Sequence, residues 1–93
     1  MTKLGLKDIH DSMDQAVGWE LIGHEIQKVF HFQSFEESIK FVNAVAEVAK
    51  DINHYPEIYI KTDKVTLTLT THDLQGLTSK DFDVAKAVNK IQI

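Results

Sequence analysis

The sequence has 93 residues and a mass of 10.6 kDa, which is the size of one domain and excludes a two-domain enzyme or a long repeat array. It contains no cysteine, so disulfides, thiol nucleophiles and cysteine-ligated metal sites are excluded. A formal net charge of -4 argues against direct nucleic-acid binding, and no apolar run approaches the roughly 18 residues of a membrane span. We expect a single cytoplasmic domain over residues 1–93, without a membrane segment. Five histidines are the compositional feature that suggests acid–base chemistry.

The first part of the chain predicts a helix followed by a β-hairpin. Apolar residues at helical spacing indicate an amphipathic helix over residues 6–17. Two strands are expected next, over residues 19–22 and 25–32, because the Gly23-His24 pair between them is typical of a turn.

The middle of the chain predicts one long helix. Ser34 and Glu37 have the spacing of a capping box, which marks the start of a helix. A helix of about twenty residues is expected to follow, ending before Pro56, because the residue before a proline avoids helical backbone angles. One apolar stripe at helical spacing is expected along it: Phe35, Ile39, Val42, Val45, Ala46, Ala49 and Ile52.

The last third predicts a second hairpin and a final helix. Strands are expected over residues 57–61 and 65–71, and the second alternates strictly between apolar residues and threonines. Thr78 and Asp81 give a second capping signal. The predicted order is α-β-β-α-β-β-α, an α+β fold in which a four-stranded antiparallel sheet carries its helices on one face. The open face or edge of such a sheet favours self-association.

Two histidines lie where predicted elements end. His54 follows the long helix and His72 follows the last strand, and such junctions often carry binding and catalytic groups. If the two hairpins pair side by side, these ends converge, with Asp81 nearby at the start of the final helix. Two imidazoles and a carboxylate in one cleft could form a general acid–base site.

Plainer interpretations of the same residues stay open. Either histidine alone is more often a solvated loop residue, and Asp81 is locally explained as a helix cap. A tyrosine such as Tyr55 is most often a half-buried aromatic residue. A metal site is disfavoured because no histidine pair has a known zinc-motif spacing. The remaining histidines are expected to be structural or surface residues: His10 on a helix, His24 in a turn and His31 within a strand.

Several short motifs occur in a fixed order along the chain: Val17-Gly18-Trp19, Val29-Phe30-His31-Phe32, His54-x-Pro56, Thr71-His72, Gly76-Leu77-Thr78 and Asp81. Together they resemble the pterin-4a-carbinolamine dehydratase family over nearly the whole chain. The resemblance implies the same α-β-β-α-β-β-α fold, with helices packed on an antiparallel sheet. From the open face or edge of the sheet we expect a homodimer or homotetramer.

The resemblance implies an activity and a set of site residues. The reaction would be dehydration of 4a-hydroxytetrahydropterin to quinonoid dihydropterin, which recycles the tetrahydrobiopterin cofactor of aromatic amino-acid hydroxylases. It would need no metal or organic cofactor. His54 and His72 would carry the proton transfers, and Asp81 would orient or tune the His72 side. The residues expected to line the pterin pocket are Asn53, His54, Tyr55, Thr70, Thr71, His72 and Asp73.

Three positions depart from the family pattern. Tyr55 stands where the family has its second histidine, Thr62 replaces a downstream aromatic, and Lys50 replaces an acidic residue. A tyrosine hydroxyl, with an ordinary pKa of about 10, is a poor base at pH 7, and losing one acid–base group costs roughly 10²–10⁴-fold in rate. Two hypotheses stay open. The first is an active dehydratase. The alternative is a catalytically weakened pterin-binding or protein-interaction module, since some family members serve as dimerisation partners of a homeodomain transcription factor.

Overall fold

The computed structural model describes residues 2–93 and confirms the α+β class and the order α-β-β-α-β-β-α. The elements in chain order are α1 (Leu6–Met13), β1 (Glu20–Ile22), β2 (Glu25–His31), α2 (Phe35–Ile52), β3 (Glu57–Lys61), β4 (Lys64–Leu69), the short 3-10 helix η1 (His72–Leu74) and α3 (Ser79–Asn89). Within residues 2–93, none of the helices is both long and apolar enough to cross a bilayer.

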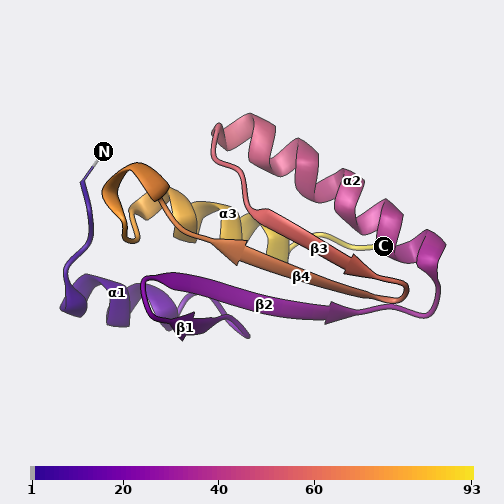
Figure 1. Ribbon diagram of the computed structural model, residues 1–93, viewed down its shortest axis with the longest axis horizontal. Coiled ribbons are helices and arrows are strands. Elements are labelled where there is room, and N and C mark those ends of the chain that lie inside the picture. The colour runs from indigo at the N-terminus through magenta and orange to yellow at the C-terminus, as the bar shows by residue number, and fades with distance from the viewer. Residues whose placement is uncertain (1) are drawn as a thin grey trace.

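The four strands form one antiparallel sheet in the order β1-β2-β4-β3. The two hairpins lie side by side because β2 pairs with β4, in a register that runs from Ile26 opposite Leu69 to His31 opposite Lys64. Helices α2 and α3 cover one face of the sheet, and the other face is open to the viewer in Figure 1. The end of α2, the end of β4 and the start of α3 all lie at the same end of the molecule (Figure 1).

The core lies between the covered face of the sheet and helices α2 and α3. The alternation predicted for β4 is confirmed, since its apolar side chains are buried and its threonines are only half-buried up to Thr68. The fully or nearly fully buried apolar residues of these elements are Ile26, Phe41, Val45, Ala49, Val65, Leu67, Leu69, Phe82, Val84, Ala85 and Val88.

The stripe predicted on α2 was wrong at two positions. Phe35 is 49% exposed and Ala46 is also exposed, whereas Ser38 and Phe41 are buried. Phe41 is drawn inward because its ring packs 4.6 Å from that of Phe30, measured between centroids. The buried hydroxyl of Ser38 is satisfied locally, because it donates to the carbonyl oxygen of Ser34 at 3.3 Å.

Several predicted boundaries also shift. The first helix ends at Met13 rather than Val17, because the chain turns there to bury Ala16 while Val17 stays 71% exposed. Strand β4 ends at Leu69, and an unpredicted turn follows in which the Thr71 N–H donates to the carbonyl of Gly76 at 2.8 Å. This turn contains η1.

Both helix-start signals are confirmed, with one difference in detail. The Ser34 hydroxyl accepts the Glu37 N–H at 3.1 Å, as an N-cap residue does. The Glu37 carboxylate accepts the N–H of Gln33, one residue earlier than in a capping box. At the start of α3 the box is formed, and Asp81 accepts the N–H of Thr78 at 2.9 Å.

Candidate active site

A cavity of about 320 Å³ opens where α2 and β4 end. Its lining residues are the seven that the sequence predicted for the pterin pocket: Asn53, His54, Tyr55, Thr70, Thr71, His72 and Asp73. The expected convergence of the two histidine-bearing junctions is therefore realised, because the β2–β4 pairing brings the two hairpins together. The binding role of these residues stays a prediction.

His54 is placed by the way α2 ends. Asn53 adopts left-handed backbone angles, φ 60° and ψ 45°. Its N–H donates to the carbonyl of Lys50 at 3.2 Å, and the His54 N–H donates to that of Ala49 at 3.0 Å. These two bonds form a Schellman motif, in which asparagine is one of the few residues other than glycine that fits the left-handed position. The sharp turn directs His54 back toward the start of α3.

The loop that carries His72 is held from two sides. The Thr70 hydroxyl lies within hydrogen-bonding distance of the carbonyl oxygens of His24, at 2.9 Å, and Gly76, at 3.3 Å. These contacts join the β1–β2 turn to the segment after β4. His72 itself is exposed at the rim of the cavity, as is Asp73.

Asp81 is fully buried and contacts His54, not His72. Its Oδ1 lies 2.6 Å from His54 Nε2, while its Oδ2 accepts the Thr71 hydroxyl at 2.8 Å and the Thr78 N–H at 2.9 Å. On the His72 side the contact of Asp81 is with Thr71, the residue before His72, and a role of Asp81 in orienting or tuning that side stays a prediction. The interpretation of Asp81 as a helix cap is confirmed, and the same carboxylate also contacts an imidazole; its catalytic role stays a prediction. Because it is buried, these three partners are also what offsets its loss of hydration.

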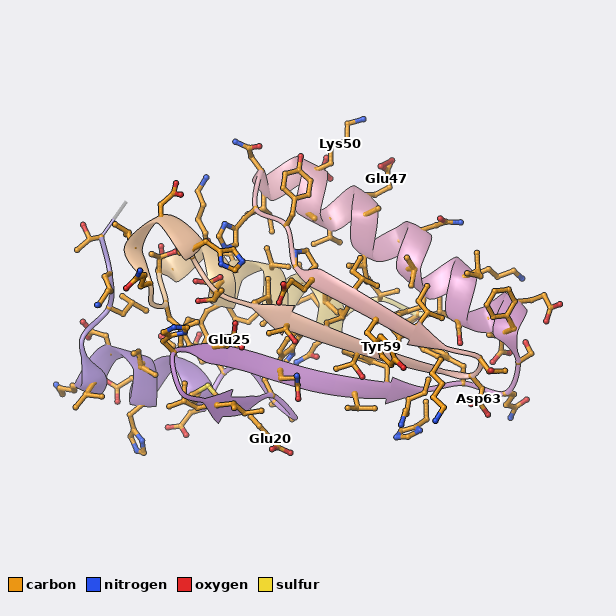
Figure 2. The ribbon with its side chains drawn as sticks, viewed as in Figure 1. Glu20, Glu25, Glu47, Lys50, Tyr59 and Asp63 are labelled. Carbon is orange, nitrogen blue, oxygen red and sulfur yellow. The ribbon has the colours of Figure 1, made fainter. Side chains whose placement is uncertain are left out.

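Of the three departures from the family pattern, only Tyr55 lies at the cavity, where it is 62% exposed. Thr62 is in the β3–β4 turn with φ 50°, next to Asp63, which Figure 2 places at the opposite end of the strands. Lys50 is exposed, and its side chain points away from the sheet in Figure 2. Among residues 2–93, no three acidic or histidine side chains gather as a metal site would require.

Two contributions at the site were missed from the sequence. Thr71 was predicted as a residue that lines the pocket, but its hydrogen bond to Asp81 was not predicted. The left-handed position of Asn53 was also missed, although an asparagine just after a helical pattern is a known stop signal. The capping motif of Thr78 and Asp81 was the one sequence signal for the position of Asp81, because a capping residue holds its carboxylate at the N-terminal end of the helix, here α3.

Comparison with known proteins gives consistent matches over nearly the full length. The family model for pterin 4 alpha carbinolamine dehydratase matches residues 2–91. A relative from Cyanothece sp., named provisionally as a pterin-4-alpha-carbinolamine dehydratase, is 44% identical over 84 residues, which are 90% of this chain and 87% of the relative.

Two solved structures are also similar. A protein from Brucella melitensis, described as a transcriptional coactivator/pterin dehydratase, is 26% identical with a TM-score of 0.89, over 95% of this chain and 96% of its own. A pterin dehydratase-like protein, described as a RuBisCO assembly factor in the alpha-carboxysome, is 19% identical with a TM-score of 0.60, over 80% and 89%; this second likeness concerns the fold alone. On the match to the family model and the identity to its relatives, the chain belongs to the pterin-4-alpha-carbinolamine dehydratase family.

Proposed function

We propose that this chain is an enzyme that removes water from 4a-hydroxytetrahydropterin to give quinonoid dihydropterin, in tetrahydrobiopterin recycling in the cytoplasm. The observation that carries the proposal is the meeting of His54 and His72 in one cavity of about 320 Å³, in a chain of the dehydratase family. Loss of water from this carbinolamine needs a proton delivered to the C4a hydroxyl and a proton removed from N5.

The two imidazoles supply the proton donor and the proton acceptor in this scheme. Histidine suits both roles because its ordinary pKa is near neutral pH. Asp81 holds His54 by the 2.6 Å contact to Nε2, so His54 keeps one ring orientation while His72 lies at the exposed rim. The scheme uses no metal or organic cofactor.

The test is stopped-flow dehydration of synthetic 4a-hydroxytetrahydropterin, with and without the protein. We expect acceleration over buffer, a loss of roughly 10²–10⁴-fold in His54→Ala or His72→Ala, and no loss in His10→Ala, whose side chain lies on α1 outside the cavity. A rate indistinguishable from that in buffer would overturn the proposal, and full activity in His54→Ala would overturn the role of His54.

The second candidate is a weakened dehydratase that acts as a pterin-binding or protein-interaction module. It is favoured by Tyr55, which lines the cavity where the family has its second histidine, and by the similar protein that is described as a transcriptional coactivator/pterin dehydratase. If Tyr55→His raises turnover by orders of magnitude, the natural chain is a weakened enzyme. An unchanged or lower turnover in Tyr55→His supports the first candidate.

We also propose that the protein forms a homodimer or homotetramer. Strand β3 is an edge of the sheet, so one side of its backbone has no neighbouring strand within residues 2–93. If two copies pair antiparallel about Tyr59, Glu57 of one copy lies opposite Lys61 of the other, because each is two residues from the centre. Opposite charges stabilise such cross-strand pairs. Sedimentation that finds only the 10.6 kDa species at micromolar concentration would overturn this proposal.

A further inference from the structure

Three buried polar side chains connect His54 to the interior beneath the cavity. Asp81 and Thr78 are fully buried, and Thr71 is 7% exposed. The Thr71 hydroxyl oxygen lies 2.8 Å from Asp81 Oδ2 and 3.0 Å from the Thr78 hydroxyl oxygen. This cluster extends past the carboxylate–imidazole pair, and the proposed acid–base scheme assigns no role to its hydroxyl groups.

The direction of each hydrogen bond follows from counting protons. A threonine hydroxyl has one proton, and that of Thr71 is donated to Asp81. The contact between the two hydroxyls must therefore run from Thr78 to Thr71. The Thr78 N–H also donates to Asp81 Oδ2, so this oxygen receives two donors while Oδ1 is left for the imidazole.

This arrangement determines which nitrogen of His54 carries the proton. An ionised carboxylate only accepts hydrogen bonds, so His54 Nε2 donates to Oδ1 across 2.6 Å. Nδ1 makes no hydrogen bond within residues 2–93, yet no side-chain nitrogen or oxygen that is buried there lacks a partner. Nδ1 is therefore in contact with solvent, and His54 is one of the residues that line the cavity.

We propose that Thr71 is a positioning residue: its hydroxyl fixes the Asp81 carboxylate, which holds His54 with Nε2 protonated and Nδ1 presented to the substrate. The catalytic consequence rests on the proposed dehydratase function, whereas the positioning itself does not. Without the Thr71 hydroxyl, Oδ2 keeps only the Thr78 N–H, so the carboxylate can rotate and the short bond to His54 loosens.

The experiment compares Thr71→Val, which removes the hydroxyl at similar volume, with Thr71→Ser, which retains it. Proton–nitrogen NMR of the free protein follows the Nε2 proton of His54, identified by its loss in His54→Ala. We expect a downfield, slowly exchanging resonance in the natural chain and in Thr71→Ser, and an upfield-shifted or exchange-broadened one in Thr71→Val. Thr66→Val, which changes a half-buried threonine of β4 away from Asp81, is the matched control and should leave the resonance unchanged.

Kinetics supply the second readout. Thr71→Val should lower kcat by about 10- to 100-fold with little change in KM, because a misplaced acid–base group slows the chemical step more than it weakens binding. Thr71→Ser should restore kcat to within about threefold.

The NMR and the kinetic measurements together distinguish failure of the positioning role of Thr71 from failure of the proposed dehydratase function. An unchanged Nε2 resonance in Thr71→Val overturns the positioning role, whatever the turnover. A changed resonance in a protein without dehydratase activity supports the positioning role and overturns the proposed function. If Thr71→Val does not fold, Thr71→Ala removes the same hydroxyl with a smaller side chain and is held to the same outcomes.

Discussion

At the scale of single residues, Asp81 has two tasks that are usually divided between two side chains. Its Oδ2 accepts the Thr78 N–H at the start of α3, and its Oδ1 binds the His54 ring. A carboxylate this deeply buried is tolerated because each of its oxygens has a donor. The stability of α3 and the orientation of His54 therefore depend on the same group.

Replacing Asp81 should therefore reduce stability as well as activity. We expect Asp81→Ala to lower the free energy of unfolding by about 2–4 kcal/mol, because it removes a helix cap and leaves buried donors without acceptors. Asp83→Ala, an exposed acid on the same helix, should change it by less than about 0.5 kcal/mol. Urea denaturation measures both, and equal stability of the two variants would contradict the double role.

At the scale of elements, the end of α2 decides where the first histidine lies. The Schellman motif needs left-handed backbone at Asn53, so the residue type there matters even without a side-chain contact. The Lys80 ammonium also donates to the carbonyl of Ile52 at 3.3 Å, which ties α3 to this helix end. A change of backbone geometry here should move His54 relative to Asp81.

Substitutions at Asn53 test this dependence. Asn53→Val should lower the free energy of unfolding by about 1–2 kcal/mol, since a β-branched residue is strained in the left-handed region. Asn53→Gly should stay within about 0.5 kcal/mol of the natural chain, because glycine adopts these angles freely. Thermal or urea unfolding of the pair provides the comparison, and a valine variant as stable as the glycine variant would refute the argument.

A second junction joins β2 to the end of α3. The Lys28 ammonium donates to the side-chain oxygen of Asn89 at 2.8 Å and to the carbonyl of Val17 at 3.1 Å. Asn89 also accepts the indole N–H of Trp19 at 3.1 Å. Burial lowers the pKa of Lys28 from its ordinary value of 10.5, because the partly buried ammonium loses hydration.

This shift predicts a pH dependence of stability. Between the folded-state pKa and 10.5 the unfolded chain binds more protons at Lys28 than the folded chain does, so the contribution of this group to stability rises with pH. The free energy of unfolding of the natural chain, relative to that of Lys28→Met, should therefore increase from neutral pH toward pH 10.5. Denaturant titrations at several pH values measure the difference, and a difference that falls with pH would contradict the assignment.

At the scale of the whole molecule, the sheet has one covered face and two edge strands, β1 and β3, of which β3 is the longer. Tyr59 is 62% exposed, and Figure 2 shows it on the side of the sheet that faces the viewer, away from α3. Its neighbours Glu57 and Lys61 are both exposed and carry opposite charges. Such an edge is suited to pairing with its own copy.

A charge swap tests the self-pairing of β3. Lys61→Glu places two acids opposite each other across the expected dimer axis, so sedimentation velocity should shift toward the 10.6 kDa species. The double variant Glu57→Lys/Lys61→Glu restores opposite charges and should restore the assembly. Lys7→Glu, which makes the same charge change on α1, should leave the assembly intact; a double variant as dissociated as the single one would count against this pairing.

Much of the fold could be predicted because local patterns carry it. Alternation in β4 and the start signals at Ser34 and Thr78 depend on neighbours within a few residues, and these predictions were confirmed. The burial of Phe41 could not be read the same way. Phe41, Val45 and Ala49 also lie at helical spacing, so spacing allows more than one stripe, and the contact of Phe41 with the ring of Phe30 on another element favours this one.

The candidate site could also be predicted from the sequence only in part. The sequence by itself determined the element order and placed His54 and His72 at element ends, because periodicity and chain breaks are local properties. Only the tertiary structure decided that Asp81 meets His54 rather than His72, and that Thr71 supports it. His54 and Asp81 are 27 residues apart, and their contact depends on the pairing of β2 with β4 and on the packing of α2 against α3. Packing between distant elements fixes those distances, and no local pattern encodes them.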